Sequence, residues 1–296
     1  MSIPSLSPTH LDLESWVLEV KSDPVRHRER QVAHILLFAV GRTPILRDNL
    51  LLKGGTLLST AYQSARQTGD VDFTAVVPAE PYASKLREIL DKALRLALED
   101  LDYNELVLQV QKIKLQPSKE MFATAIAPAL NITIGSAKRG TNEEQNLKRG
   151  QAAQVLHIDL SFSEPVLNVQ ALTLNQEGIT IKAYGIEDII AEKLRALIQQ
   201  PIRKRNRRQD IYDIHWLLET KSIDLKQKEA ILKGLIAKSG ARDVNPNKGS
   251  LDYSEVKDRA QQDWQSMILE VGTLPDFEVA YNIVRDFYVS LPWPEK

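Results

Sequence analysis

The sequence predicts an α+β fold in which a mixed sheet with flanking helices is followed by an all-helical C-terminal half. Strand-like segments occur only before about residue 180, at Asn49–Lys53, Asp70–Val77, Leu106–Leu115, Leu130–Ser136 and Val155–Phe162. Beyond that point, apolar residues recur only at helical spacing. We therefore expect two domains, residues 1–180 with an N-terminal helical segment and residues 181–296.

The helical segments are predicted from apolar side chains that recur every three or four residues. They are 9–40 (split near Pro24), Thr56–Arg66, 82–101, Ile186–Gln199, Asp210–Glu219, 225–238, 254–269 and 276–290. Two polar stretches of mixed or basic charge, Lys138–Gly150 and Arg203–Arg208, are predicted as loops.

Composition excludes several classes of protein. The 296 residues are 43% hydrophobic and 26% charged, as in water-soluble globular proteins, and the net charge of −1 gives no global basic field for nucleic acid. The absence of cysteine excludes disulfides, thiolate metal sites and a cysteine nucleophile. Met1–Ser5 lacks a signal-peptide layout, and Ile35–Val40 is too short to span a bilayer, so we expect a cytoplasmic protein without a membrane partner.

The segment Lys53-Gly54-Gly55-Thr56 has the composition of a phosphate-binding turn. Glycine has no Cβ, so the backbone N–H groups of such a turn can approach phosphate oxygens, and Thr56 adds a hydroxyl. The segment follows a predicted strand and precedes a predicted helix. We interpret it as a cradle for a nucleoside triphosphate.

Asp70-Val71-Asp72 follows that helix and places two carboxylates on one face of a strand, because strand side chains alternate. Two carboxylates on one face form a hard oxygen site suited to Mg²⁺. On the strand Val155–Phe162, Asp159 lies on the polar face, and it would join the pair if the two strands were neighbours. The alternative for each acid is a solvent-facing side chain on an amphipathic strand.

Lys193 lies in line with Ile186, Ile190 and Leu197 on the apolar face of its predicted helix. A lysine there requires a counter-ion or must extend to the helix edge. Triphosphate oxygens are one partner. The other is a carboxylate of the next helix, where Asp210 and Asp213 both qualify, although Asp210 is also well placed to cap that helix.

Basic residues suggest contacts with anions. Arg66, four residues before Asp70, is interpreted as a phosphate or carboxylate clamp, with a surface salt bridge as the alternative. The run Arg203-Lys204-Arg205-Asn206-Arg207-Arg208 is either a solvated loop or a contact for an RNA backbone. The histidines show no metal-ligand spacing, and we expect His27 and His34 at the surface or at an edge.

These residues together resemble the AbiEii/MenT-type nucleotidyltransferase toxins of the DNA polymerase β-like superfamily. The likeness covers residues 50 to about 220 and rests on five motifs: Lys53-Gly54-Gly55-Thr56-Leu57, Gly69-Asp70-Val71-Asp72-Phe73, Arg66-Gln67-Thr68-Gly69-Asp70, Ala191-Glu192-Lys193-Leu194 and Arg208-Gln209-Asp210-Ile211-Tyr212-Asp213. It implies a polymerase β-like core, Mg²⁺-dependent use of an NTP, and toxin activity opposed by a cognate antitoxin.

The resemblance also implies roles for individual residues. The residues expected to bind nucleotide are Lys53, Gly54, Gly55, Thr56, Arg66 and Lys193; those expected to bind metal are Asp70, Asp72 and Asp159; those expected in catalysis are Asp70, Asp72, Asp159, Lys193 and Asp210; those expected to bind RNA are Arg203, Arg205, Arg207 and Arg208.

We therefore expect an enzyme that transfers NMP from an NTP to a hydroxyl, most simply the 3′ end of an RNA such as tRNA. Two alternatives remain at this stage: the same transfer to a small-molecule or protein hydroxyl, and a catalytically silent module that binds nucleotides or a protein partner.

Overall fold

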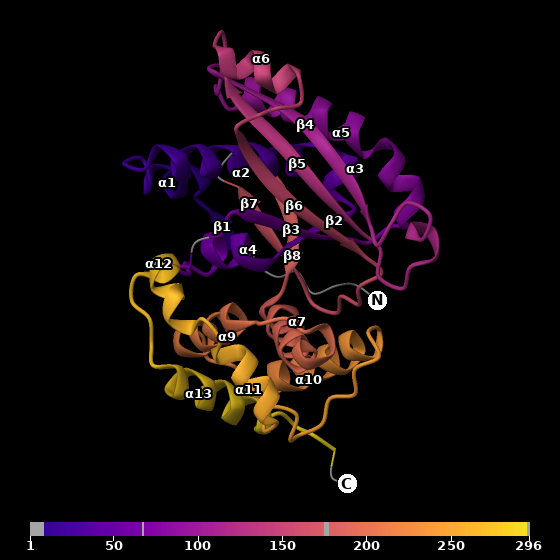
Figure 1. Ribbon diagram of the computed structural model, residues 1–296, viewed down its shortest axis with the longest axis vertical. Helices are drawn as coiled ribbons and strands as arrows, with labels where there is room; N and C mark the ends of the chain where they lie inside the picture. The colour runs from indigo at the N-terminus through magenta and orange to yellow at the C-terminus, as the bar shows by residue number, and fades with distance from the viewer. Residues whose placement is uncertain (1–8, 67, 175–177, 295–296) are drawn as a thin grey trace. The chain divides into compact units, whose positions relative to one another are not determined.

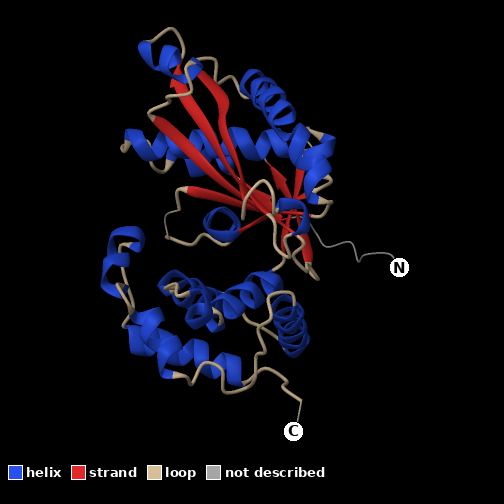
Figure 2. Cartoon of the chain, turned by 45° about the vertical axis from the view of Figure 1, so that its right-hand side comes forward, coloured by secondary structure: helices blue, strands red, loops and turns tan. Residues whose placement is uncertain are grey.

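A computed structural model describes residues 9–66, 68–174 and 178–294; the predicted N-terminal segment Met1–Ser5 lies outside them. The chain forms two compact units. The first contains Met1–Ala61, Thr68–Glu164 and Gln170–Ala183, and the second contains Tyr62–Gln67, Pro165–Val169 and Tyr184–Lys296. Figure 2 shows strands and helices together in the first unit and helices alone in the second.

The first unit is built on an eight-stranded mixed sheet in the order β1-β7-β8-β2-β3-β6-β5-β4. The strands are β1 Thr9–Leu11, β2 Leu50–Lys53, β3 Asp70–Ala75, β4 Leu106–Gln116, β5 Ala129–Lys138, β6 Gln154–Phe162, β7 Val169–Leu174 and β8 Thr180–Tyr184. β3 is antiparallel to β2 and parallel to β6, and β5 is antiparallel to both β6 and β4. The strands β3 and β6, which are far apart in sequence, are therefore neighbours at the centre of the sheet.

The helices of this unit are α1 Leu13–Leu18, α2 Pro24–Arg42, α3 Pro44–Arg47, α4 Gly54–Ala61, α5 Ala79–Asp100 and α6 Asn142–Lys148, with the short 3₁₀ turn Phe122–Thr124. α2 and α5 are the long ones, and they pack against each other (Figure 1). Both present buried apolar residues, such as Ile35 and Leu94, toward the core. They cover the apolar side of the sheet, which includes Val71, Phe73 and Ile158.

The opposite side of the sheet is polar around β3 and β6. Along β3, Val71 and Phe73 are buried whereas Asp70 is exposed, and along β6, Ile158 is buried whereas Asp159 is exposed. This alternation is the expected pattern of a sheet with one face in the core. It leaves the predicted acids on the face away from α2 and α5.

From Ile186 onward, the described residues of the second unit form helices joined by loops, with no strand. Its helices are α7 Ile186–Ile198, α8 Gln200–Arg203, α9 Arg208–Thr220, α10 Leu225–Gly240, α11 Ser254–Gln261, α12 Ile268–Val271 and α13 Phe277–Val289, with a 3₁₀ turn at Trp264–Met267. α7 packs against α9 and α10, and α9 packs against α13. A mixed sheet followed by these helices confirms the predicted fold class.

Two predicted helices are shorter than expected because the backbone turns left-handed. The helix predicted over Thr56–Arg66 ends at Ala61, and Gln63 has a φ of 54°. The helix predicted over 254–269 stops at Gln261, before Asp263 with a φ of 59°. A left-handed residue cannot continue a right-handed helix.

The prediction of a loop over Lys138–Gly150 was wrong for the middle of this segment, which forms the helix α6. Leu147 is buried, and Glu143 and Glu144 accept hydrogen bonds from the backbone N–H groups of Lys138 and Gly140. Acids at a helix N-terminus stabilise even a short, polar helix.

Two further predictions need correction. The strands β1, β7 and β8 were not predicted: β1 has only three residues, and β8 lies beyond the point after which the sequence was expected to form helices alone. His34, expected at the surface or an edge, is 1% exposed on α2, and its Nδ1 lies 3.2 Å from the Tyr103 hydroxyl. Burial lowers the pKa of this imidazole to about 4, against the raising effect of Asp12.

Candidate active site

The Gly-Gly turn approaches the acids so closely that glycine is required at its first position. Gly54 has a φ of +71°, and a Cβ there would lie 1.9 Å from Asp72 Oδ2. Both the backbone conformation and the carboxylate therefore exclude a side chain. Thr56 donates its hydroxyl hydrogen to the backbone oxygen of Asp70 at 2.8 Å, which ties the start of α4 to the start of β3.

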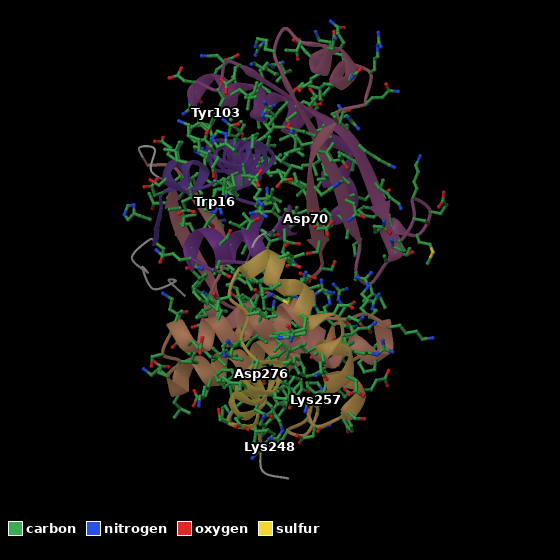
Figure 3. All side chains as sticks on the ribbon, turned by 60° about the vertical axis from the view of Figure 1, so that its left-hand side comes forward. Trp16, Asp70, Tyr103, Lys248, Lys257 and Asp276 are labelled. Carbon is green, nitrogen blue, oxygen red and sulfur yellow. The ribbon has the colours of Figure 1, made fainter. Side chains whose placement is uncertain are left out.

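The three predicted carboxylates lie together on β3 and β6. Asp72 is the register partner of Asp159, and Asp70 is the partner of His157, across the parallel pair. Register partners on neighbouring strands place their side chains on the same face. The predicted meeting of Asp159 with the Asp70-x-Asp72 pair therefore occurs, and Asp70 can be found in Figure 3.

Asp70 lies in an unfavourable environment for a negative charge. Although Asp70 is exposed as a residue, partial desolvation of its carboxyl group and then the neighbouring Asp159 carboxylate raise its pKa above the ordinary value, against the lowering effect of His157. No ion pair to the Asp70 side chain is present among the residues that the structure describes. A cation at this position would relieve the repulsion between the carboxylates.

One cross-strand row runs through this face of the sheet. The register places Lys53, Asp72, Asp159, Asn131 and Lys114 side by side on β2, β3, β6, β5 and β4. Asn131 Nδ2 donates to Asp159 Oδ1 at 2.5 Å, and Gln116 Nε2 donates to Asn131 Oδ1 at 2.9 Å. Two amides therefore fix the third carboxylate.

The oxygen donors fit a Mg²⁺ ion that completes its shell with substrate. Within the described residues no three His, Cys, Asp or Glu side chains form a ready-made metal cluster. Mg²⁺ usually binds one or two carboxylates together with phosphate oxygens and water, so a preassembled cluster is not required. Asp70 and Asp72, with Asp159 opposite, supply carboxylates of this kind.

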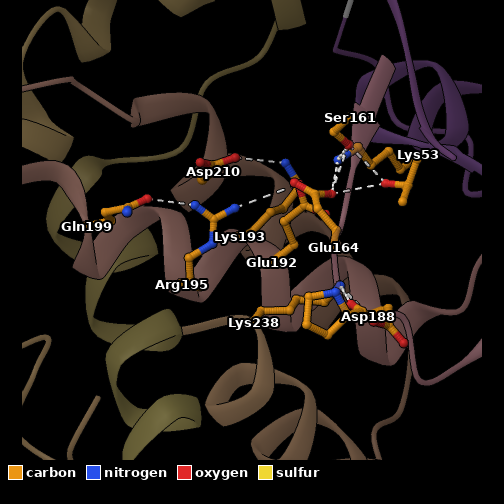
Figure 4. A network of polar contacts seen from close by, with 12 residues as sticks. Lys53, Ser161, Glu164, Asp188, Glu192, Lys193, Arg195, Gln199, Asp210 and Lys238 are labelled. Atoms are coloured by element: carbon orange, nitrogen blue, oxygen red, sulfur yellow. Dashed lines mark hydrogen bonds and ion pairs between the residues drawn. The ribbon is translucent and has the colours of Figure 1, made fainter. Parts of the chain in front are cut away.

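Lys53, predicted to bind nucleotide, belongs to a hydrogen-bonded cluster in the first unit (Figure 4). Its Nζ donates to Glu164 Oε2 at 2.6 Å and to Ser161 Oγ at 2.9 Å, and the residue is 7% exposed. Thr74 donates to the same Glu164 oxygen at 3.0 Å. The ammonium of Lys53 is thus neutralised by Glu164, a residue that the sequence analysis did not single out.

In the second unit, α7 and α9 bring Lys193 together with both candidate acids. Lys193 Nζ donates to Asp210 Oδ1 at 2.9 Å and to Asp213 Oδ2 at 2.6 Å (Figure 4 shows the Asp210 contact). Burial alone would lower the pKa of Lys193, but the two carboxylates outweigh it and the net shift is upward. The carboxylate partner anticipated for a lysine on an apolar helix face is therefore present, and it comes from two acids.

Arg66 completes this group from the segment before β3. Its Nε and Nη2 donate to the two oxygens of Asp213 at 2.8 and 2.9 Å, in the paired geometry that favours arginine with carboxylate. Burial would raise the pKa of Asp213, but Lys193 and Arg66 lower it to below its ordinary value. Trp216 Nε1 also donates to the backbone oxygen of Tyr62 at 3.3 Å, so the segment 62–66 is held by α9 at two points.

The basic run is only partly a loop. Arg203 ends α8, Lys204 is left-handed with a φ of 49°, and α9 begins at Arg208. Arg203 and Arg205 are exposed. By contrast, Arg208 Nη2 lies 3.6 Å from Glu270 Oε1, and Arg207 Nε lies 3.9 Å from Asp210 Oδ2. The part of the run that faces solvent is its beginning.

Sequence reasoning missed several residues of these clusters, most clearly Asn131, Gln116 and Glu164. Asn131 and Gln116 belong to no sequence motif. They come close to their hydrogen-bond partners only through the register of the strands. The polar alternation of β5 could have marked Asn131 as lying on one face with Thr133, but no local pattern places that face beside Asp159.

A family model for the AbiEii nucleotidyl transferase toxins of type IV toxin–antitoxin systems matches residues 35–283. The chain belongs to this family. It is therefore a nucleotidyltransferase toxin, and the match extends well beyond the segment that carries the sequence motifs. No curated protein matches this AbiEii-family chain.

Three solved structures resemble the AbiEii-family chain. MenT4, a nucleotidyltransferase toxin from Mycobacterium tuberculosis H37Rv, is 14% identical with a TM-score of 0.55, over 94% of this chain and 89% of that chain. A putative nucleotidyltransferase from Helicobacter pylori is 14% identical with a TM-score of 0.48 over 88% of this chain and 92% of that chain. JHP933 from Helicobacter pylori is 15% identical with a TM-score of 0.46, over 88% and 89%. At such identities the likeness to MenT4 supports the fold alone.

Among the described residues, no helix has both the length and the apolar composition needed to cross a membrane.

Proposed function

We propose that this toxin is a cytoplasmic, Mg²⁺-dependent enzyme that transfers NMP from an NTP to the 3′ hydroxyl of an RNA such as tRNA. The observation that carries the proposal is the row of carboxylates on β3 and β6, directly beside the glycine turn that opens α4. Family membership supports nucleotidyl transfer, and the raised pKa of Asp70 supports a role for a cation.

The proposed transfer needs no covalent bond between the protein and the substrate. The acceptor oxygen bonds to the α-phosphorus, the bond from that phosphorus to its leaving oxygen breaks, pyrophosphate departs, and the hydroxyl proton passes to Asp159. When bound, Mg²⁺ would supply neutralisation of phosphate charge and a lower pKa for the attacking hydroxyl. Asp70 and Asp72 would hold the metal, and the N–H groups of Gly54 and Gly55 would bind triphosphate.

The helical unit would supply Lys193 and Asp210, as the family resemblance implies. Lys193 would neutralise phosphate oxygens, and its raised pKa keeps it protonated at neutral pH. The exposed Arg203 and Arg205 favour a polyanionic acceptor, because contacts of this type are made to phosphates without regard to sequence. A cognate antitoxin is the expected protein partner of a type IV toxin.

The test is incubation of the purified protein with Mg²⁺, each α-labelled NTP in turn, and total RNA. Label in RNA, lost with EDTA and in Asp70→Asn, is the expected result. Label in protein or a small molecule instead would reject the RNA acceptor but retain nucleotidyl transfer. Tight NTP binding with no transfer to any acceptor would reject the enzymatic proposal.

A further inference from the structure

The Asp213 carboxylate is completely engaged. Oδ1 accepts from Arg66 Nε, and Oδ2 accepts from both Arg66 Nη2 and Lys193 Nζ, at 2.6 to 2.9 Å. The side chain is 0% exposed. Because both of its oxygens already accept hydrogen bonds, any effect of Asp213 on the reaction passes through the side chains that it holds.

Asp210 differs from Asp213 in the hydrogen bonding of one carboxylate oxygen. Its Oδ1 accepts from Lys193, but its Oδ2 is buried and receives no hydrogen bond from the described residues; the nearest ion-pair atom is Arg207 Nε at 3.9 Å. A buried carboxylate oxygen without a donor is unfavourable. Asp210 therefore retains the capacity to accept a hydrogen bond from a hydroxyl or water, which Asp213 lacks.

Charge explains why Arg66 is needed. Lys193 alone between two carboxylates would leave this group with one net negative charge, which would repel a triphosphate. Arg66 adds one positive charge and makes the group neutral. Two of the three ammonium hydrogens of Lys193 are engaged by acids, so its direction is set while one hydrogen remains for another acceptor.

We infer that Arg66 and Asp213 form a positioning pair that holds and charge-compensates Lys193, whereas Asp210 is the acid that meets a reactant. This inference rests on the proposed function and deepens it. It replaces the sequence-based assignment of Arg66 to nucleotide binding, because Nε and Nη2 of its guanidinium both donate to Asp213. It also separates the roles of the two acids, which the sequence left open.

A double-mutant cycle tests the pair. Arg66→Gln, Asp213→Asn and the double variant are assayed for kcat and for the KM of NTP, well below their melting temperatures. Each single variant should lower kcat by about 100-fold, since misplacing a catalytic group by 1 Å has an effect of this size. The double variant should be no slower than the slower single variant, because both changes disable the same element.

Other outcomes overturn the inference. Multiplied losses in the double variant would show that Arg66 acts independently. A raised KM for NTP with unchanged kcat in Arg66→Gln would make it a nucleotide clamp. Lower melting temperatures with kcat and KM unchanged would make the pair merely structural. If Arg66→Gln does not fold, Arg66→Lys takes its place, since it keeps the charge but cannot form the paired contact.

Asp188→Asn is the matched control. Asp188 makes a buried ion pair with Lys238 at 2.8 Å in the same unit and has no role in the proposed reaction (Figure 4). This variant should lose stability but keep kcat and KM. A kcat loss equal to that of Asp213→Asn would show that any broken buried pair has this effect, and would overturn the inference.

NMR of ¹⁵N-labelled lysine separates this inference from the proposed function. The Nζ signal of Lys193, assigned by its loss in Lys193→Met, should be resolved and protected in the wild type without nucleotide, and should shift and exchange faster in Arg66→Gln. This change would uphold the pair even if the wild type transferred no nucleotide. An unchanged signal would reject the pair even if transfer were found.

Discussion

The two units differ in how the charges of their acidic side chains are balanced. On β3 and β6 of the first unit, partial burial and the nearby Asp159 raise the pKa of Asp70, and among the described residues no ion pair to Asp70 is present. In the second unit, Arg66 and Lys193 balance Asp210 and Asp213, and the pKa of Asp213 is lowered. Repelling carboxylates gain from the arrival of a cation, whereas a balanced buried group gains only by staying intact. The difference supports our proposals that Asp70 takes part in cation binding and that Asp213 holds other side chains.

The largest effect on activity should follow from changing Asp70. Asp70→Asn should lower transfer by more than about 100-fold, because one ligand of the metal is lost, yet it should leave the melting temperature unchanged or raised. The charged form of Asp70 is the unfavourable one in the folded protein, so an amide relieves repulsion.

Calorimetry and a transfer assay check this prediction. Mg²⁺ with a non-hydrolysable NTP should raise the melting temperature of the wild type but not of Asp70→Asn. Asp102→Asn is a suitable control, since Asp102 is exposed and its left-handed backbone accepts asparagine. Near-normal turnover of Asp70→Asn at saturating Mg²⁺ would remove Asp70 from the metal site.

Changing Asp213 should have the opposite effect on stability. Asp213→Asn leaves Arg66 and Lys193 buried with only Asp210, and should cost about 3–5 kcal/mol of unfolding free energy. Because the folded pKa of Asp213 is lowered, its stabilisation is present above the unfolded pKa of about 3.9 and is lost as pH falls through the folded value. Asp70 has the reverse sign, since protonation there favours the folded state.

Urea unfolding between about pH 2 and pH 7 measures the Asp213 contribution, which is lost as pH falls below the unfolded pKa of about 3.9. The wild type and Asp70→Asn should lose stability toward low pH with Asp213 as a contributor, and Asp213→Asn should show a shallower loss. An equally steep loss in Asp213→Asn would show that this carboxylate is not stabilised as the geometry indicates.

The sequence predicted the acids, the glycine turn and the lysine, because each lies within a short segment whose periodicity fixes its face. Asp70-x-Asp72 needs only strand alternation, and Lys193 needs only helical spacing. The neighbours of these residues were not predictable. Asn131 reaches Asp159 only through the order of β5 and β6, and Arg66 reaches Asp213 across 147 positions of sequence.

A moderate effect is expected at Asn131. Asn131→Ala removes the hydrogen bond to Asp159 and should lower kcat about tenfold, an effect typical of residues that orient a ligand-binding group. The KM for NTP should change less than kcat. Gln116→Ala, which removes the next hydrogen bond outward, should have a smaller effect of the same kind. A larger loss at Gln116 than at Asn131 would show that the chain of amides does not act through Asp159.

The smallest effect is expected at the exposed part of the basic run. Arg203→Gln with Arg205→Gln should weaken RNA binding a few-fold and reduce the slope of log affinity against log salt concentration by about 1–2, because fewer counterions are released. The KM for NTP should not change. Lys85→Gln with Lys92→Gln on α5 removes the same charge from exposed positions and should leave the slope intact. Equal slopes in the two double variants would show that the basic run is a solvated loop that does not contact RNA phosphates.

The sequence separation within both charge groups has a consequence for the order of synthesis. β3 can pair with β6 only after α5, β4 and β5 have been made, and Arg66 must wait for Asp213, 147 positions later. Long-range parallel pairing also forms slowly, because a long loop must close first. A ribosome that stops before residue 213 therefore releases a chain in which Lys193 has lost a partner and Arg66 has none of its Asp213 contacts. On these grounds, we expect chains that end before residue 213 to lack nucleotidyl transfer, because Asp213 is missing from the group that holds Lys193.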